Sequence, residues 1–484
     1  MSVAESSRRE EAVSPSAVRA SDRLGLRPLH AAVLALAWPV LGEQILGFCV
    51  GLFDTWLSGR ISPGATAAVG LAAYVAWLAT MLFGVVSVGA TAIVARYWGA
   101  GEEANANAVA NRTLSLGLIA GLVYYAALYP GAPWLARGLS LSGESFDIAV
   151  RYLRWDGAGQ VVTAMSLAGF ASLRGAGDMK TPLAIGIAMN VLNAGASWLF
   201  VYGVEPLGLA PQGANGIVYG TVLARTFGGL ALLGALAGGT TRLRLNLWEL
   251  LPDRETTRRV LKIGVPAAFD GAVRWGGHFA FLSLIAALPL TADRGESAVA
   301  SGERNEVTFA AHIVAVRLEA ITYLPAVAWG AAAATLVGQG LGAKRVRRAK
   351  TVGHLAAAQC AVLGGFITAA LVFAAAPLVT FMHADPGVQA EAGRALPVLG
   401  LFQIPLTASI VYVSALRGAG ETRVPLLITL VGMYLLRLPL AWYFGAHLGW
   451  GLAGAYLGMG GDVLCRATAS GVWFKVGRWW RKKV

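Results

Sequence analysis

The chain has 484 residues, of which 56% are hydrophobic and only 13% are charged. A typical soluble protein has roughly 25% charged residues, and a chain with half that share would leave large apolar patches facing water. The composition therefore excludes a cytosolic globular enzyme, a disordered protein and a nucleic-acid binder. It indicates an integral membrane protein that crosses the bilayer several times.

Twelve apolar segments follow a polar tail at residues 1–28. Each is long enough for a helix that crosses the ~30 Å hydrocarbon core, and their continuous apolar character differs from the alternation of barrel strands. The predicted fold class is therefore all-α, with twelve transmembrane helices. The predicted spans are 30–57, 65–95, 107–129, 147–172, 181–203, 213–238, 258–289, 307–337, 350–381, 390–416, 424–446 and 449–474.

The net charge of +13 records the orientation of these spans. The two tails and the loops after even-numbered spans hold 27 of the 39 basic residues, whereas the loops after odd-numbered spans hold seven. Because cytoplasmic loops collect Lys and Arg, this distribution predicts that both termini are cytoplasmic in an inner cell membrane. The basic run at 342–350 is then an ordinary cytoplasmic loop, and we expect no nucleic-acid partner.

The two halves of the chain repeat each other. LRGAGDMKTPL at 173–183 and LRGAGETRVPL at 416–426 share seven of eleven residues at an offset of 243. Near the start of each half the offset falls to 227, which aligns Pro39 with Pro266, and an insertion at 291–306 accounts for the difference. Six spans per half give a parallel repeat, with a pathway at the interface between the halves. This organisation favours a transporter over a receptor or a membrane enzyme.

The repeat divides the chain into five predicted segments. They are a cytoplasmic tail at 1–28, an amino-terminal lobe at 29–240, a cytoplasmic linker at 241–257, a carboxyl-terminal lobe at 258–476 and a basic tail at 477–484.

The first span carries two carboxylates, Glu43 and Asp54. Eleven residues of helix rotate by only about 20° more than three full turns, so both side chains face the same way, ~16 Å apart. Ionisable groups inside spans are costly and are functional candidates by default, so Glu43 and Asp54 are both candidates for cation coupling. A carboxylate with little water around it can bind and release a proton near neutral pH, or it can bind Na⁺ if other oxygens surround it.

Several short motifs follow one another along the chain. They are Pro39 and Glu43 followed by LFDTWLSG (52–59), the two LRGAG loops, AHIVAVRLE (311–319), ATLVGQ (334–339) and RLPLA (437–441). In their order and spacing, from about residue 30 to residue 476, these motifs resemble the multidrug and toxic compound extrusion (MATE) transporters. The family implies two six-helix lobes around a central cleft. It also implies export of amphipathic, often cationic compounds in exchange for H⁺ or Na⁺.

The resemblance implies a cation-coupling site in the amino-terminal lobe. Its members would be Asp54 with Asn193, Ser197 and Thr221, which match polar positions on the fifth and sixth helices. Some family members carry Asp where Ser197 stands, so the lower negative charge here favours H⁺ over Na⁺. A simple helix–helix hydrogen bond is the alternative interpretation of Asn193, and a hydrated position at the outer interface is the alternative for Asp54.

The carboxyl-terminal half departs from this pattern. The repeat partner of Glu43 is Asp270, whereas the partner of Asp54 is Phe281. One branch of the family has a second cation site here, with a Glu where this chain has Arg274 and an Asp where it has Leu406. We therefore expect no second site and coupling through the amino-terminal lobe alone.

Four further charges lie in two neighbouring spans of this half, Asp270 and Arg274 in one, Arg317 and Glu319 in the next. Ion pairing that neutralises buried charge is the simpler interpretation. Contact between Asp270 or Glu319 and a cationic substrate is the alternative. Asp156 and Arg225 of the other half are interpreted as structural.

The sequence thus predicts a secondary antiporter without a cofactor, in which H⁺ or Na⁺ is the coupling ion. Its expected partners are small organic cations or drugs and the lipid bilayer, and it is expected to be a monomer. A flippase of lipid-linked saccharides or lipids, with the same architecture and a strongly cationic cleft, is the principal alternative. No cluster of residues has the spacing of a metal site, and no catalytic set is expected.

Overall fold

The computed structural model describes residues 26–138, 141–204, 208–286 and 298–482. Apart from one bridge between Val204 and Leu209, the regular structure of these residues is helical. The first half forms α2 (Leu26–Gly59), α3 (Pro63–Ala100), α4 (Glu103–Gly138), α5 (Gly143–Gly175), α6 (Lys180–Tyr202) and α7 (Ala214–Ala237). Most of the predicted tail at 1–28 lies outside the described residues.

The second half follows a short turn of helix, η3 (Leu247–Glu249). Its helices are α8 (Arg254–Ala286), α9 (Ala298–Gly342), α10 (Val346–Phe373), α11 (Ala375–Met382), α12 (Pro386–Gly400), α13 (Gln403–Gly418), α14 (Arg423–Leu430), η4 (Val431–Arg437), α15 (Leu438–Trp442), η5 (Tyr443–His447), α16 (Gly451–Val476) and η6 (Trp479–Arg481). The predicted insertion at 291–306 lies partly outside the described residues, and its last part begins α9.

The described helices are compatible with the prediction of twelve spans. Eight of them, counting α14 through η5 as one, are long and apolar enough to cross a membrane, and α12 with α13, bent by 51°, makes nine if the pair is one broken span. The other three, α5, α8 and α16, are equally long but carry ion pairs in their interiors. Charged residues that are paired inside the protein lower the mean hydropathy of a helix without exposing charge to lipid.

Local sequence explains several helix ends. At the start of α3, the Ser62 hydroxyl accepts a hydrogen bond from the backbone amide of Ala65. The same helix ends at Gly101, which has a φ of 79°. Asp385 caps α12 in the same way, and Pro386 follows at its first position. These residues are favoured at helix ends because they satisfy unpaired amides or adopt a left-handed backbone at low cost.

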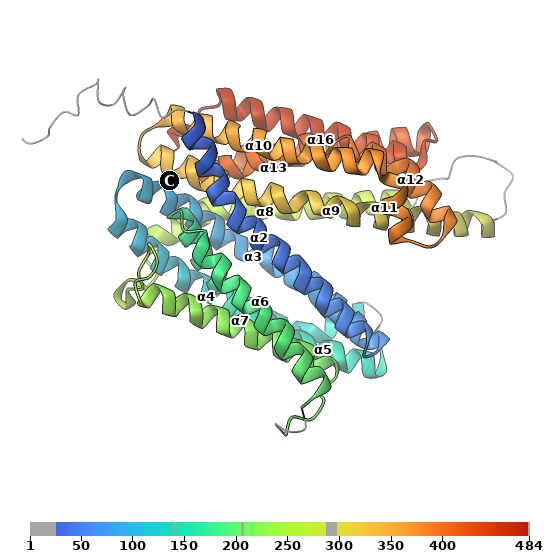
Figure 1. Cartoon of the computed structure of the whole chain (residues 1–484), viewed down its shortest axis with the longest axis horizontal. Helices are drawn as coiled ribbons and strands as arrows, with labels where there is room; N and C mark the ends of the chain where they lie inside the picture. The colour runs from blue at the N-terminus through green and yellow to red at the C-terminus, as the bar shows by residue number, and fades with distance from the viewer. Residues whose placement is uncertain (1–25, 139–140, 205–207, 287–297, 483–484) are drawn as a thin grey trace, which may run out of the picture.

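The two halves form two lobes that contact each other through equivalent helices (Figure 1). In the amino lobe, α5 packs against α3 and α4, and α6 packs against α7. In the carboxyl lobe, α9, α10 and α13 pack together. Between the lobes, α2 packs on α9 and α8 packs on α3. The first helix of each lobe therefore contacts the second helix of the other, as a parallel repeat requires.

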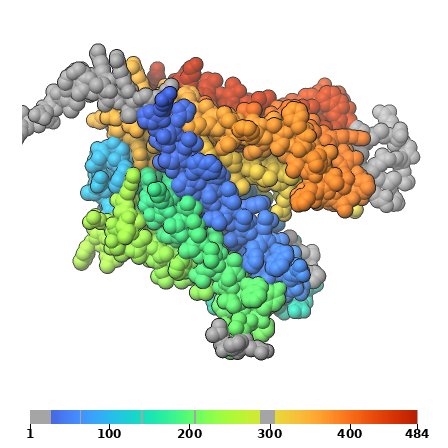
Figure 2. Space-filling view, viewed as in Figure 1, coloured from blue at the N-terminus to red at the C-terminus, as the bar shows by residue number. Residues whose placement is uncertain are grey.

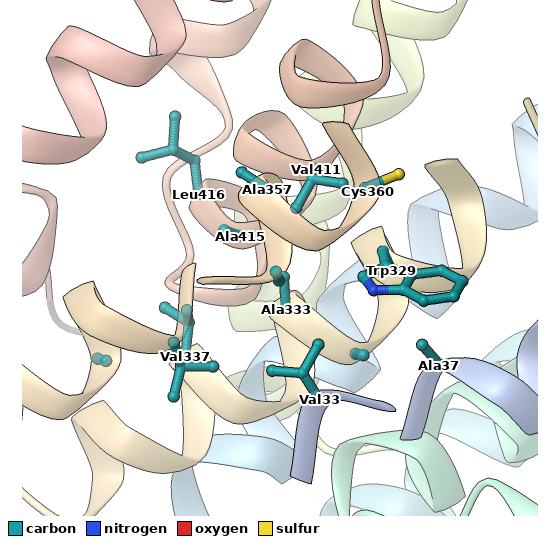
Figure 3. Close-up of a cluster of buried hydrophobic side chains, with 14 of the residues drawn as sticks. Val33, Ala37, Trp329, Ala333, Val337, Ala357, Cys360, Val411, Ala415 and Leu416 are labelled. Atoms are coloured by element: carbon teal, nitrogen blue, oxygen red, sulfur yellow. The ribbon is translucent and has the colours of Figure 1, made fainter. Parts of the chain in front are cut away.

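A buried apolar cluster joins the lobes at one of these contacts. Val33 and Ala37 of α2 lie beside Trp329 and Ala333 of α9 (Figure 3). The cluster continues into α10 and α13 and reaches Trp479, which follows α16. Because apolar burial stabilises contacts roughly in proportion to area, this cluster fixes α2 to the carboxyl lobe.

The lobes diverge away from this contact. Their packed ends hold residues 96–100 and 339–343, whereas the far end of α2 and the region of α11 and α12 stand apart. Figure 2 shows the hollow that opens between them. The chain is thus captured with its lobes closed at one end and separated at the other.

Candidate functional site

Asp54 lies in the last two turns of α2, within the amino lobe. Its Oδ1 atom is buried and accepts no hydrogen bond from the described residues. A buried acceptor without a donor is unfavourable by about 1–3 kcal/mol, and more when it is charged. A proton or a cation bound at this oxygen would remove that cost, so Asp54 has the chemistry of a reversible cation site.

The polar residues predicted on the fifth and sixth spans lie together between α6 and α7. Asn193 donates from Nδ2 to Oγ1 of Thr221 at 3.1 Å. The hydroxyls of Thr221 and Ser197 both donate to the carbonyl of Ile217, at 2.9 and 3.2 Å. Asn193 thus makes the helix–helix hydrogen bond of the simpler interpretation, but its Oδ1 is buried without a donor among the described residues. Asp54 makes no hydrogen bond with this group in the described structure.

An ion pair between α5 and α7 belongs to the same lobe interior. Arg225 donates to Oδ1 of Asp156 at 2.7 Å, and Gln160 approaches the other oxygen at 3.4 Å. Both charges interact electrostatically with Asp54. The sequence marked this pair as structural, and the pairing agrees with that interpretation. Its proximity to Asp54 also makes it part of the candidate site.

Glu43 is held in a different contact from Asp54. Nη2 of Arg174 lies 2.6 Å from each of its carboxylate oxygens. The repeat equivalents make the same pair, because Arg417 contacts Asp270 in the carboxyl lobe. In each lobe, the arginine of the LRGAG loop therefore pairs with the acidic residue of the first helix, which lies four residues after Pro39 or Pro266. These arginine partners were not predicted from the sequence, although the repeat of both motifs was a usable signal.

The carboxyl-lobe candidates separate into the pair of Asp270 and Arg274, and two residues, Arg317 and Glu319, that lie outside this pair. Asp270 is fully buried and also pairs with Arg274 at 2.7 Å, as the simpler interpretation expected. Glu319 is buried and interacts with Gln403. Arg317 lies exposed and makes no ion pair with any residue that the structure describes. The structure therefore does not unite these four residues in one site.

Phe281, the repeat partner of Asp54, is buried and lies against the guanidinium of Arg437 at 5.7 Å from the ring centroid. Arg437 in turn pairs with Asp462 at 2.8 Å. The two lobes thus differ at this position: one presents a carboxylate, the other a phenyl ring.

Hydrogen bonds across the lobes close the packed end. Thr335 and Gln339 of α9 donate to the carbonyls of Arg174 and Gly175, each at 2.9 Å. Arg96, the repeat equivalent of Gln339, donates to the carbonyl of Ala419 at 3.5 Å. Each LRGAG loop is therefore held by the second helix of the opposite lobe.

The segment after α16 adds to this closure. Trp479 is only 1% exposed and stacks on Phe474. Lys482 pairs with Glu421 at 2.6 Å, and its carbonyl accepts a hydrogen bond from Arg96. The described part of the predicted basic tail, residues 477–482, is thus packed against both lobes through Lys482.

The closed end depends on two equivalent glycines. A Cβ atom at Gly99 would overlap the backbone of Gln339, and one at Gly342 would overlap the backbone of Arg96. Both pairs are related by the repeat offset. Because the obstructing atoms are backbone, the helices would have to separate to admit a side chain.

We therefore expect Gly99→Ala to weaken closure at this end. Spin labels at Glu103 and Arg347, in a background without the three cysteines, should show a larger long-distance population than in the parent. Gly234→Ala is the matched control, because a Cβ there meets nothing within 4 Å. Identical distance distributions for all three proteins would contradict the assignment of this contact as the closure.

Two parallel lobes, a carboxylate inside one of them and a closure at one end define a membrane transporter. A family model for MatE matches residues 39–199 and 297–443. The chain belongs to this family of membrane transporters, and it is therefore not an enzyme.

Curated relatives match along nearly the whole chain. A probable multidrug resistance protein NorM from Thermotoga maritima is 27% identical over 456 residues, which cover 93% of each chain. The multidrug resistance protein PmpM from Pseudomonas aeruginosa is 26% identical and covers 85% of this chain and 83% of its own.

Solved structures share the fold. A MOP superfamily transporter from Pyrococcus furiosus superposes with a TM-score of 0.82 at 22% identity, covering 92% of this chain and 95% of its own. An outward-facing multidrug resistance MATE transporter gives a TM-score of 0.81 at 22% identity with the same coverage.

Proposed function

We propose that the protein is a proton-coupled antiporter that exports amphipathic, often cationic organic compounds by alternating access. It would lie in the inner cell membrane with both termini in the cytoplasm. The names of the multidrug resistance relatives support the substrate class. The distribution of basic residues supports the orientation, which makes the packed end cytoplasmic and the separated end external.

The unpartnered Oδ1 of Asp54 is the observation that carries the proposal. Arg225 is paired with Asp156, so among the described residues Asp54 has no ion-pair partner of its own. A single proton would neutralise it. A bound Na⁺ would need several oxygen ligands around Asp54, and none of Asn193, Ser197 and Thr221 hydrogen-bonds to Asp54 in the described structure. This arrangement favours H⁺ over Na⁺.

The transport cycle follows from the two ends of the lobes. A proton from outside reaches Asp54 while the lobes are separated there, changes the hydrogen bonding of the amino lobe and disfavours bound substrate. The substrate leaves outward, and return of the proton inward accompanies the opposite closure. Each charge that crosses 100 mV supplies about 2.3 kcal/mol, which is an adequate driving force.

The absence of an Asp54 equivalent in the carboxyl lobe supports coupling through the amino lobe alone. Phe281 replaces the equivalent of Asp54, and the arginines near it are paired with Asp270 or Asp462. Each of these aspartates is shared by two arginines, so the pairs offset only part of the positive charge and do not decide against a flippase of lipid-linked saccharides. The antiporter is preferred over that alternative because of the multidrug resistance relatives.

The proposal is tested with purified protein in liposomes that contain a fluorescent organic cation. Imposed proton and Na⁺ gradients of equal size are applied in separate experiments, with protein-free liposomes as the control. We expect flux of the dye under the proton gradient and little under the Na⁺ gradient. Flux driven only by Na⁺ would contradict the choice of ion, and no flux under either gradient would support the flippase.

A further inference from the structure

Four basic residues line one hollow at the packed end of the carboxyl lobe. Arg254, Arg258 and Lys262 recur every four residues on α8, so they follow one face over ~12 Å. Arg423, the first residue of α14, lines the same hollow. Its volume is about 750 Å³, and α8 and α14 pack against each other beside it. All four side chains are exposed.

No carboxylate in the described chain neutralises these four residues. The acid in the hollow, Asp253, accepts a hydrogen bond from the amide of Thr256 and lies 3.6 Å from Arg112. Although slight burial acts in the opposite direction, these hydrogen bonds and the charge of Arg112 lower the pKa of Asp253. Asp253 is therefore an anion that another arginine already balances. The four cations face the solvent-accessible hollow with an excess of positive charge.

The hollow continues into an apolar surface. Leu261, Val265 and Phe269 lie on the exposed face of α8 and are 42–61% exposed. On the neighbouring helix α14, Leu427 is 60% exposed. Exposed apolar side chains on spanning helices contact lipid chains, so a basic cluster at their cytoplasmic end lies at the depth of the headgroups.

The repeat shows that this cluster is not a general feature of the lobes. The equivalents of Arg254 and Arg423 in the amino lobe are basic, Arg27 and Lys180. The equivalents of Arg258 and Lys262 are Ala31 and Ala35. Orientation of the chain by positive charge requires only that such residues lie in the loop. It does not require four of them to converge on one hollow between two helices.

We propose that this hollow binds the headgroup of an anionic phospholipid, whose acyl chains lie on the exposed apolar faces of α8 and α14. The phosphate would contact the guanidinium groups of Arg254, Arg258 and Arg423, and Lys262 would extend from the helix to the same level. Basic pockets between helices on the cytoplasmic side hold such headgroups in membrane proteins. Because α8 contacts α3 of the other lobe, a lipid bound here lies at a helix of the lobe interface.

The test measures lipid binding by native mass spectrometry of the full-length protein in a mild detergent. Dioleoylphosphatidylglycerol, dioleoylphosphatidylcholine and inorganic phosphate are titrated separately. The fourfold variant Arg254→Gln, Arg258→Gln, Lys262→Gln and Arg423→Gln is compared with the parent. We expect phosphatidylglycerol to bind the parent. The fourfold variant should bind this lipid at least about tenfold more weakly. A double variant, Lys262→Gln with Arg423→Gln, serves if the fourfold variant does not fold.

A matched control removes four charges from the neighbouring cytoplasmic loop: Lys344→Gln, Arg345→Gln, Arg347→Gln and Arg348→Gln. Equal losses in the control and the hollow variants would overturn the proposal, because bulk surface charge would then explain binding. So would equal binding of phosphatidylcholine, or full competition by inorganic phosphate. The assay contains no gradient and no transported compound, so its failure would leave the proposed antiport untouched.

Discussion

Replacement of Asp54 by Asn is expected to abolish gradient-driven efflux while the protein remains folded. Asparagine keeps the size of the side chain but removes the group that takes up and releases the proton. The buried Oδ1 would stay in place without its negative charge. We expect dye flux in liposomes to fall to the level of protein-free controls, and size-exclusion profiles to match those of the parent.

Asp147→Asn is the matched control for this change. Asp147 lies exposed on α5 of the same lobe. The Asp147→Asn variant therefore makes the same chemical change outside the lobe interior. Flux should be unchanged in this variant. Undiminished flux in Asp54→Asn would remove the amino-lobe carboxylate from the coupling mechanism.

Replacement of Asp462 by Leu is expected to have the largest effect on stability. The carboxylate is fully buried and accepts hydrogen bonds from Arg437 at 2.9 Å and from Arg466 at 2.7 and 2.9 Å. Its removal takes the ion-pair partner from the buried guanidinium of Arg437 and the partly buried one of Arg466. Loss of one partner from a buried pair is unfavourable by about 3–5 kcal/mol. The thermal unfolding midpoint in detergent should therefore fall sharply.

A triple variant separates lost charge balance from lost packing. Leucine at Asp462, Arg437 and Arg466 removes the unpaired charges together with the carboxylate, and apolar replacement of a whole buried network is often close to neutral. We expect the triple variant to unfold at a higher temperature than Asp462→Leu alone. An equally low midpoint in both would show that the shape of these side chains matters more than their charge.

The spans and the repeat could be predicted from the sequence because their signals are local. A continuous apolar segment specifies a spanning helix wherever it occurs, and all twelve predicted spans coincide with helices or helix pairs. The boundaries proposed for the two lobes stay a prediction. The structure extends α3 and α4 past the predicted ends, because helices continue beyond the hydrocarbon core while their amides remain paired.

The arrangement of the site was less accessible, since pairing depends on positions far apart in the chain. Asn193, Ser197 and Thr221 lie together between α6 and α7, and their role in cation binding stays a prediction. Glu43 was expected to act with Asp54 because both share one helix face. Its partner Arg174 is 131 residues away and is brought near by α5. Only the matching pair in the other lobe could have indicated this contact.

The closure of the lobes at one end and their separation at the other could not be predicted from the sequence. The closed end depends on helix approaches at Gly99 and Gly342 that are specified by the absence of side chains. A glycine in a spanning segment is common and does not reveal which helix it contacts.

Competition between the proton and the transported compound is the central claim, and proton release measures it most directly. An organic cation that the liposome assay shows to be transported is added to purified protein in weakly buffered detergent solution near neutral pH, and the pH is recorded. Because binding of two ligands is reciprocally linked, a substrate that disfavours the protonated state must release protons. We expect release of up to about one proton per molecule in the parent and none in Asp54→Asn. Substrate binding without proton release in the parent, across the pH range in which Asp54 titrates, would contradict the account.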